Sequence, residues 1–318
     1  MNVLSLFDGM SCGQIALNRA NIPYKKYLAS EIDKWAIKIT QHNYPDTIQL
    51  GDVSNIKSED LPPIDPLIGG SPCQGFSLAG NQLAFDDDRS KLFFEFVRLL
   101  KECKPKYFLL ENVRMKKEWQ EVITKFLGVE PIVINSRLVS AQNRVRFYWT
   151  NIPGITQPKD KNIKLIDVYE ADVPTKYDCT DSVVQRVLGA KRGKGYFYNP
   201  DTHDKIGTVI SGYYKYPTDG CYIECGASRG RYNKDGSTSQ QIEIRNDCKT
   251  NALTTVQKDN LLIEDRARYR RLTPLECERL QTVPEGYTSI VSDTQRYKML
   301  GNGWTVDVIT HILKNMEL

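Results

Sequence analysis

The chain has 318 residues, 40% of them hydrophobic and 26% charged, so it has enough apolar material for a sizeable core. Its net charge of +4 is compatible with a polyanionic partner, and no run approaches the ~18 apolar residues that a membrane span needs. The eight scattered cysteines and the absence of a basic leader favour reduced thiols in a cytoplasm, no secretory signal and no bound metal.

The first predicted strand, residues 3–7, runs into a glycine-containing turn that opens a helix from about residue 14 to 20. Glycines at such a turn let a ligand approach the backbone at a helix N-terminus. A pyrophosphate-binding fingerprint has three glycines and this turn has two, so we expect a nucleoside cofactor without phosphates. The residues of the turn that are expected to contact it are Phe7, Asp8, Gly9, Met10 and Gly13.

Acidic residues follow the next two predicted strands. Glu31 ends the strand 27–30, at the distance from the glycine turn where a carboxylate can accept both hydroxyls of a ribose. Asp52 ends the third strand, after a helix over residues 34–43, and is placed for an adenine amino group. Together with their neighbours Ile32 and Val53, these residues predict a nucleoside pocket.

Cys73 follows a short apolar run with two glycines, which predicts a buried strand entering a tight loop at the carboxyl edge of an open sheet. Pro72 fixes its own φ and restricts the preceding residue, so the cysteine is held at a defined angle. A lone cysteine is usually a packing residue, but the partners downstream favour a nucleophile. The aperiodic run 75–90 is interpreted as a mobile lid. A helix is expected from Leu92, which we count among the cofactor contacts, to residue 100.

Glu111 is delivered by the buried strand 107–110, where a carboxyl group near a cleft can act as an acid. Two further strands are expected over residues 129–138 and 146–150. Arg144 and Arg146 share one face of an extended segment because side chains in a strand repeat every two residues. We interpret both as pointing into the site.

The composition changes over residues 157–265. Between residues 186 and 245 there are ten Lys or Arg against six Asp or Glu, with tyrosines interleaved. Such a segment suits a nucleic-acid groove, although a tyrosine-rich β domain can also be packed in this way. We predict a small, β-rich domain here and a catalytic domain formed by residues 1–156 and 266–318.

The C-terminal part is predicted to contain a helix from Pro274 to about Gln281 and a last helix that ends near residue 313. A Gly-Asn-Gly loop is expected before the last helix, close to the same cofactor as Gly9. Its cofactor residues are Asn302, Trp304 and Thr305. The C-terminus is expected to fold back onto the first domain.

Taken together, these motifs resemble the cytosine-C5 DNA methyltransferase family over nearly the whole chain. The matching segments are 7–13, Glu31, Asp52, 72–74, 111–113, 142–146, 271–281 and 301–302. Several details, Trp304 among them, are similar to the catalytic domain of the animal de novo enzymes. The commoner bacterial motif has a serine and a small residue after the Gly-Asn pair, so the contacts of Trp304 depart from that pattern.

The resemblance implies an α/β, Rossmann-like S-adenosylmethionine-dependent methyltransferase fold with a second, smaller β-rich target-recognition domain. It implies methylation of a cytosine flipped out of double-stranded DNA. In that family's chemistry Cys73 attacks C6 and Glu111 binds N3, while Arg144 stabilises O2 and Arg146 helps to lower the pKa of the thiol. The implied protein is a cytoplasmic monomer, with a cognate restriction endonuclease as a candidate partner.

Alternatives remain open on sequence alone. A tRNA cytosine-5 methyltransferase of the same fold carries Cys-Phe-Thr in its recognition domain, and no cysteine here precedes Phe-Thr. A non-catalytic DNA-binding member of the family would not require Cys73, Glu111 and Arg144 together. A nicotinamide dehydrogenase is a more distant alternative, because the third glycine of the phosphate loop is missing.

Overall fold

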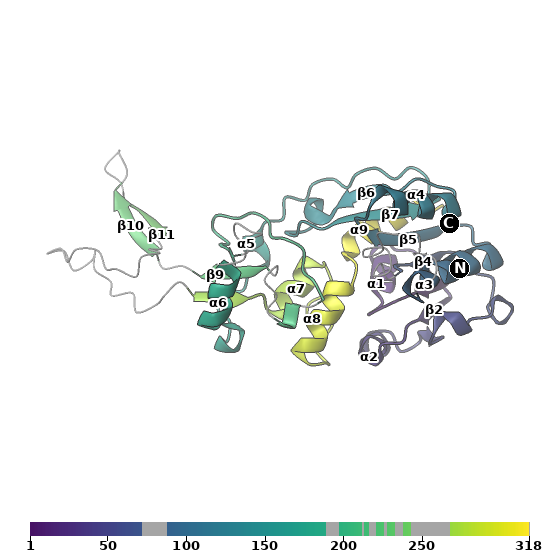
Figure 1. Ribbon diagram of the computed structural model, residues 1–318, viewed down its shortest axis with the longest axis horizontal. Helices are drawn as coiled ribbons and strands as arrows, with labels where there is room; N and C mark the ends of the chain where they lie inside the picture. The colour runs from purple at the N-terminus through teal and green to yellow at the C-terminus, as the bar shows by residue number, and fades with distance from the viewer. Residues whose placement is uncertain are drawn as a thin grey trace.

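A computed structural model describes residues 1–71, 88–188, 197–211, 213–215, 221–225, 228–232, 238–242 and 268–317. Its main body is a seven-stranded sheet with the order β3-β2-β1-β4-β5-β7-β6 (Figure 1). The strands are β1 (Asn2–Leu6), β2 (Lys26–Ser30), β3 (Ile48–Gln49), β4 (Leu67–Gly69), β5 (Phe108–Val113), β6 (Ile132–Asn135) and β7 (Val145–Thr150). The first five are parallel, and β7 runs antiparallel to both β5 and β6.

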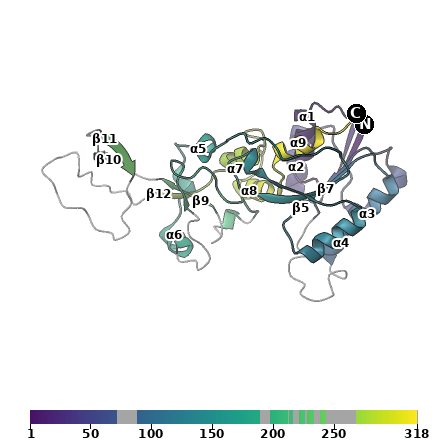
Figure 2. The same ribbon diagram turned by 90° about the horizontal axis from the view of Figure 1, so that it is seen from above.

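Alternating side chains of the strands supply two apolar layers. On β1, Val3 joins the cluster that contains the helices α1 (Cys12–Arg19), α2 (Lys34–Asn43) and α9 (Val306–Leu313). Leu4 and Leu6 join the opposite cluster, with α3 (Asp88–Cys103) and α4 (Lys117–Leu127). Figure 2 shows α1 and α9 on one side of β5 and β7, and α3 and α4 on the other. Because both faces are covered, the parallel strands are buried and strongly apolar, as expected for an α/β sheet.

A second, three-stranded sheet has the order β12-β9-β8, made of β12 (Arg268–Arg271), β9 (Tyr222–Cys225) and β8 (Phe197–Tyr198). The ribbon β10 (Ser228–Tyr232) and β11 (Thr238–Ile242) lies far to the left of the main sheet in Figure 1. The helices near the second sheet are α5 (Leu165–Val168), α6 (Asp181–Leu188), α7 (Pro274–Leu280) and α8 (Asp293–Asn302). The expected α/β fold with a small second sheet is confirmed, and short helices accompany that sheet.

Residues 206–211 are joined to residues 141–144 by several hydrogen bonds, and we call this contact the seam. The backbone N–H of Ile206 donates to the carbonyl of Ala141 at 3.0 Å, and that of Asn143 donates to the carbonyl of Ile206 at 2.9 Å. The N–H of Val209 donates to Oε1 of Gln142, also at 2.9 Å. The seam therefore anchors part of the predicted recognition segment directly on the chain that leads into β7.

Several element boundaries differ from those expected. α3 begins at Asp88, so residues 88–90 of the expected lid belong to a helix, whereas residues 72–87 lie outside the described residues. The expected Gly-Asn-Gly loop is wrong in part, because Gly301 and Asn302 end α8. A Cβ on Gly301 would lie 2.2 Å from the backbone nitrogen of Ser211. This glycine is required by close packing against the seam.

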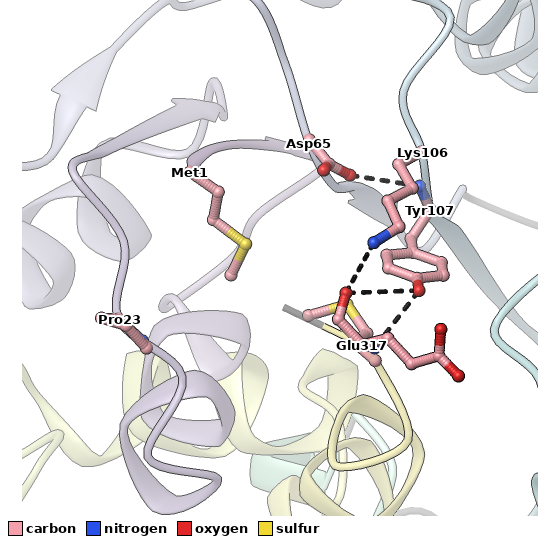
Figure 3. Close-up of a pocket in the computed structure, with 7 residues that line it drawn as sticks. Met1, Pro23, Asp65, Lys106, Tyr107 and Glu317 are labelled. Carbon is pink, nitrogen blue, oxygen red and sulfur yellow. Dashed lines mark hydrogen bonds between the residues drawn. The ribbon is translucent and has the colours of Figure 1, made fainter.

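The C-terminal segment folds back onto the first domain, as expected. Nζ of Lys106 donates to the carbonyl of Glu317 at 2.7 Å, and the hydroxyl of Tyr107 lies beside the same residue (Figure 3). These residues border a cavity of about 200 Å³ together with Met1 and Asp65. The cavity lies where β4 and β5 begin, at the opposite edge of the sheet from the predicted site. In the part of the chain that the structure describes, no helix is long and apolar enough to cross a membrane.

Candidate active site

The carboxyl ends of the parallel strands β1, β2, β4 and β5 meet at one edge of the main sheet, where ligands bind in open α/β folds. β1 leads into the glycine turn, β2 into Glu31, β4 into Gly70 and Ser71, and β5 carries Glu111 near its end. The sheet topology therefore brings together residues that were predicted separately for cofactor and substrate.

Glu31 is held in one orientation by backbone donors. Its Oε2 accepts from the N–H of Gly9 at 2.8 Å, and its Oε1 accepts from the N–H groups of Ile32 and Asp33, each at 2.8 Å. Gly9 has φ +59°, a conformation that suits glycine, and a Cβ there would have no atom within 4 Å. Ile32 beside it is 75% exposed. Open space at Gly9, an oriented carboxylate and an exposed apolar side chain fit a nucleoside cofactor.

Three other residues of the predicted cofactor turn face the protein interior. The Asp8 carboxylate accepts from the hydroxyls of Tyr27 (2.7 Å) and Ser11, and burial raises its pKa to about 6. Met10 is buried, and a Cβ on Gly13 would lie 2.6 Å from both Tyr27 and Ile68. Gly13 is therefore needed for close packing of α1 on the sheet. Asp8 stabilises the turn through its buried hydrogen bonds with Ser11 and Tyr27.

Asp52 lies on the surface at the end of β3 and caps a short 3-10 helix, Val53–Asn55. Its carboxylate accepts from the N–H of Ser54 at 2.9 Å and from its hydroxyl at 2.7 Å, which lowers the pKa of Asp52. Val53 is buried, and Leu92 packs at the margin of the same apolar cluster. Asp52 is thus accessible to a ligand, whereas the side chain of Val53 belongs to the core.

Glu111 lies at the centre of the predicted catalytic group and is only 9% exposed. Its Oε1 is 3.0 Å from Nε of Arg146, and its Oε2 accepts from the indole Nε1 of Trp304 at 3.1 Å. The next residue, Asn112, donates to the carbonyl and hydroxyl of Ser71, both at 3.3 Å. Glu111 therefore contacts the guanidinium of Arg146, and Asn112 holds the chain that leads to the predicted nucleophile.

Pro72 and Cys73 lie outside the described residues, so their roles stay predictions from the sequence. Ser71 is described, buried and held by Asn112.

Arg144 makes contacts that the sequence did not predict. Its guanidinium donates to three backbone carbonyls, those of Val209 (3.1 Å), Gly301 (3.1 Å) and Gly303 (3.0 Å). Burial, and then the nearby charge of Arg146, lower the pKa of Arg144 to about 10. The structure therefore places Arg144 where it joins the seam to the segment between α8 and α9.

Two glutamines belong to the same network, although sequence reasoning gave them no role. Gln281 donates to the carbonyl of Leu300 at 2.7 Å and accepts from the hydroxyl of Thr305 at 2.9 Å. Gln142 donates to the carbonyl of Leu280 at 3.2 Å. The signal that the sequence offered is position alone: Gln142 opens the segment 142–146, and Gln281 ends the segment 271–281. Of the predicted cofactor residues near this network, Asn302 is exposed. Thr305 is buried, and its hydroxyl donates to Gln281.

The sequence matches the model of the C-5 cytosine-specific DNA methylases over residues 1–318. The chain belongs to this family.

The curated relatives of this methylase agree. It is 31% identical over 341 residues to the type II methyltransferase M1.ScrFI of Lactococcus lactis subsp. cremoris, with 99% of this chain and 77% of the relative covered. It is 29% identical over 338 residues to the type II methyltransferase M.NlaX of Neisseria lactamica, which covers 99% and 96%.

Solved structures of methyltransferases share the fold of this methylase. The Entamoeba histolytica methyltransferase EhMeth matches with a TM-score of 0.75 at 17% identity, covering 99% of this chain and 97% of the other. The Dnmt2 methyltransferase of S. pombe matches with a TM-score of 0.68 at 19% identity, covering 98% and 97%. Family membership makes S-adenosylmethionine the cofactor, and the site at Gly9 and Glu31 fits its nucleoside part. No cluster of metal-binding side chains occurs among the described residues.

Proposed function

We propose that this methylase modifies C5 of a cytosine that is flipped out of a specific site in double-stranded DNA, with Cys73 as nucleophile and Glu111 as the residue that binds N3. The observation that supports this most is the convergence of Arg146 and Trp304 on Glu111, next to Asn112, which bonds to Ser71 on the chain that leads to Cys73. A base in a duplex cannot reach such a buried carboxyl group, so the nucleotide must leave the stack.

The residue types suit the chemistry. Cytosine C5 is a poor nucleophile until the 5,6 double bond is broken. The Cys73 thiolate adds to C6, and a proton held between Glu111 and N3 takes up the charge that develops on the ring. Bound S-adenosylmethionine supplies the methyl group to C5. Loss of the C5 proton to a base and departure of Cys73 then restore the aromatic ring.

The two arginines are assigned different tasks. Among the described residues, Arg146 contacts Glu111 and donates one hydrogen bond, to the carbonyl of Val145 at 2.8 Å. A guanidinium has five donors, so Arg146 keeps donors for the pyrimidine O2 and for the thiolate. Arg144 is occupied by three carbonyls, and we assign it the task of holding the segment around Gly303 in place.

We propose that residues 157–265 select the DNA sequence and that residues 1–156 and 266–318 perform catalysis. The excess of basic residues between residues 186 and 245 and the position of β10 and β11, away from the main sheet, support this division (Figure 1). We further propose that the protein is a cytoplasmic monomer. A restriction endonuclease is its proposed partner, as the names of the type II relatives suggest.

DNA that carries 5-fluorocytosine in the target site tests mechanism and substrate together. Fluorine cannot leave as a cation, so addition of Cys73 and methyl transfer should end in a covalent complex that survives denaturing electrophoresis. The complex should require S-adenosylmethionine, and mass spectrometry should place it on the peptide that contains Cys73.

The matched controls are Cys73→Ala, which should give no complex, and an RNA of the same sequence, which should not be trapped. A stable adduct on another cysteine would refute the role of Cys73. Efficient trapping on RNA alone would make the chain an RNA methyltransferase.

A further inference from the structure

Trp304 was expected at the cofactor, and its indole N–H bonds to the predicted catalytic residue Glu111. It donates to Oε2 of Glu111 at 3.1 Å, across 193 residues of sequence. The bond connects the segment between α8 and α9 with the end of β5. It is made to the carboxylate oxygen that does not face Arg146.

The contact is built into the fold by a missing side chain. A Cβ on Gly70 would lie 2.9 Å from Nε1 of Trp304 and 3.1 Å from Oε2 of Glu111. Distances this short require the neighbouring atoms to move. Gly70 therefore leaves the space in which the indole and the carboxylate meet.

The backbone that carries Trp304 is fixed on both sides. Arg144 donates to the carbonyl of Gly303 at 3.0 Å, and Gln281 accepts from the hydroxyl of Thr305 at 2.9 Å. The N–H of Gly303 also donates to the carbonyl of Met299 at 2.7 Å. The indole is thus attached to a segment with little freedom to move.

We propose that Trp304 is a positioning residue, which orients the Glu111 carboxylate toward the flipped cytosine. The inference rests on the proposed role of Glu111 and extends it. A glutamate has three side-chain torsions, and two contacts from separate parts of the chain, the hydrogen bond from Trp304 and the ion pair with Arg146, restrict them. A carboxylate oriented before the base arrives avoids the cost of ordering it at the moment of reaction.

Exchange of tritium from C5 of cytosine into water, without S-adenosylmethionine, isolates this step from cofactor binding. The Cys73 thiolate adds to C6, a solvent proton adds to C5, tritium leaves C5 as a proton, and the thiolate departs. Trp304→Phe keeps the ring and removes the N–H. We expect it to lower the exchange rate at saturating DNA about tenfold, because one hydrogen bond to a charged acceptor is lost. The affinity for DNA should be unchanged.

Gly70→Ala is a second, independent variant, because its methyl group displaces the indole without removing it. It should also slow exchange. Trp149→Phe is the matched control: its indole N–H donates to Thr124 at 3.0 Å, and it packs on the opposite face of the sheet from Tyr148, which pairs with Glu111. Trp149→Phe should exchange at close to the wild-type rate per folded molecule.

The outcomes separate this inference from the proposed function. If Trp304→Phe and Gly70→Ala both exchange tritium at the wild-type rate, the positioning role of Trp304 is wrong. The proposed role of Glu111 in binding N3 is then unaffected. If Trp304→Phe weakens only the binding of S-adenosylmethionine, the positioning role is also wrong. If Glu111→Gln exchanges at the wild-type rate, the role of Glu111 fails, and this inference fails with it.

Discussion

Among the residues that the structure describes, two of the buried Glu–Arg pairs are built in opposite ways. Glu276 and Arg270 are 0% and 1% exposed, and two hydrogen bonds of 2.8 and 2.7 Å join them. The same carboxylate also accepts from the N–H groups of Glu170 (2.9 Å) and Thr273 (2.8 Å). At Glu111, Nε of Arg146 lies 3.0 Å from Oε1 as an ion pair without a hydrogen bond, and among the described residues the side-chain hydrogen bond to the carboxylate comes from Trp304.

The difference separates a structural pair from a reactive one. A carboxylate has about four acceptor positions, and those of Glu276 are all used where β12 meets α7. Arg270 also stacks on Tyr169, with the guanidinium carbon 5.1 Å from the ring centre. Glu111 is oriented but keeps acceptor positions for a ligand. Unused hydrogen-bonding capacity in a buried group costs stability, so its presence indicates function.

The largest effect is expected from Glu111→Gln. Loss of a positioned acid lowers rates by ~10²–10⁴-fold, so methyl transfer to DNA from labelled S-adenosylmethionine should fall by that factor. Stability should change less than at Glu276, because Arg146 is 13% exposed in its side chain and keeps contact with solvent. Activity within tenfold of wild type, in a folded variant, would contradict the comparison.

Glu276→Gln should have the opposite profile, with a loss of ~3–5 kcal/mol in the free energy of unfolding, since it removes the buried carboxylate charge that faces Arg270. Urea denaturation measures this. The matched control is Glu285→Gln, which breaks an ion pair to Arg279 where the Glu285 side chain is 60% exposed. That variant should lose at most about 1 kcal/mol. Equal losses of unfolding free energy in Glu276→Gln and Glu285→Gln would show that the four hydrogen bonds to the buried Glu276 carboxylate add no stability.

The same contrast extends to the cofactor turn, where Asp8 faces inward and is bonded to Ser11 and Tyr27. Its pKa is about 6 in the folded protein, above the ordinary 3.8. The folded state therefore binds this proton more tightly. The resulting stability is complete below about pH 3.8 and is lost as the pH rises through 6, a change on the order of 3 kcal/mol.

Asp8→Asn cannot ionise, so its stability relative to wild type should improve steadily as the pH rises from 4 to 7. Thermal or urea unfolding across this range measures the difference. Asp52→Asn is the control with the opposite sign, because the pKa of Asp52 is lowered and its small contribution is lost as the pH falls. Parallel curves for wild type and Asp8→Asn would exclude the buried carboxylate as the cause.

Glu31→Ala should have the smallest effect of the four, a loss of ~1.5–3 kcal/mol in the binding of S-adenosylmethionine, since charge-assisted hydrogen bonds to the ribose are removed. Calorimetry measures this directly. Asp33→Asn is a suitable control, because the Asp33 side chain caps α2 and binds Lys298 at 2.6 Å, and Asp33 contacts Glu31 through its backbone N–H, which the substitution keeps. Unchanged affinity in folded Glu31→Ala would remove Glu31 from the cofactor site.

Much of the fold could be predicted from the sequence because hydrophobic periodicity determines it locally. The first strand, expected over residues 3–7, is β1 (Asn2–Leu6), shifted by one residue, and the amphipathic stretch of α2, over residues 34–43, has the expected boundaries. α7 follows from Pro274, with a capping box between Thr273 and Glu276. The edge that gathers Glu31 and Glu111 follows from the parallel strand order.

The remaining features depend on partners far away in the chain. α8 was not expected, because its residues 293–302 are mostly polar and contain a glycine that packs on Ser211. The partners of Arg144 are backbone carbonyls 65 to 159 residues away. Every residue has such a carbonyl, so the sequence does not show which ones accept. The bond between Trp304 and Glu111 is hidden for the same reason, since it needs both the sheet order and the space at Gly70.

The seam has a practical consequence for retargeting the enzyme. A chimera that exchanges all of residues 157–265 also replaces Ile206 and Val209, whose backbones bond to Ala141 and Gln142, and Ser211, which fits against Gly301. A donor loop of another length there would shift the carbonyl held by Arg144 and, through Gly303, the indole beside Glu111. The first splice point of a specificity swap therefore belongs after residue 211, so that residues 206–211 keep their contacts and the orientation of Glu111 is preserved.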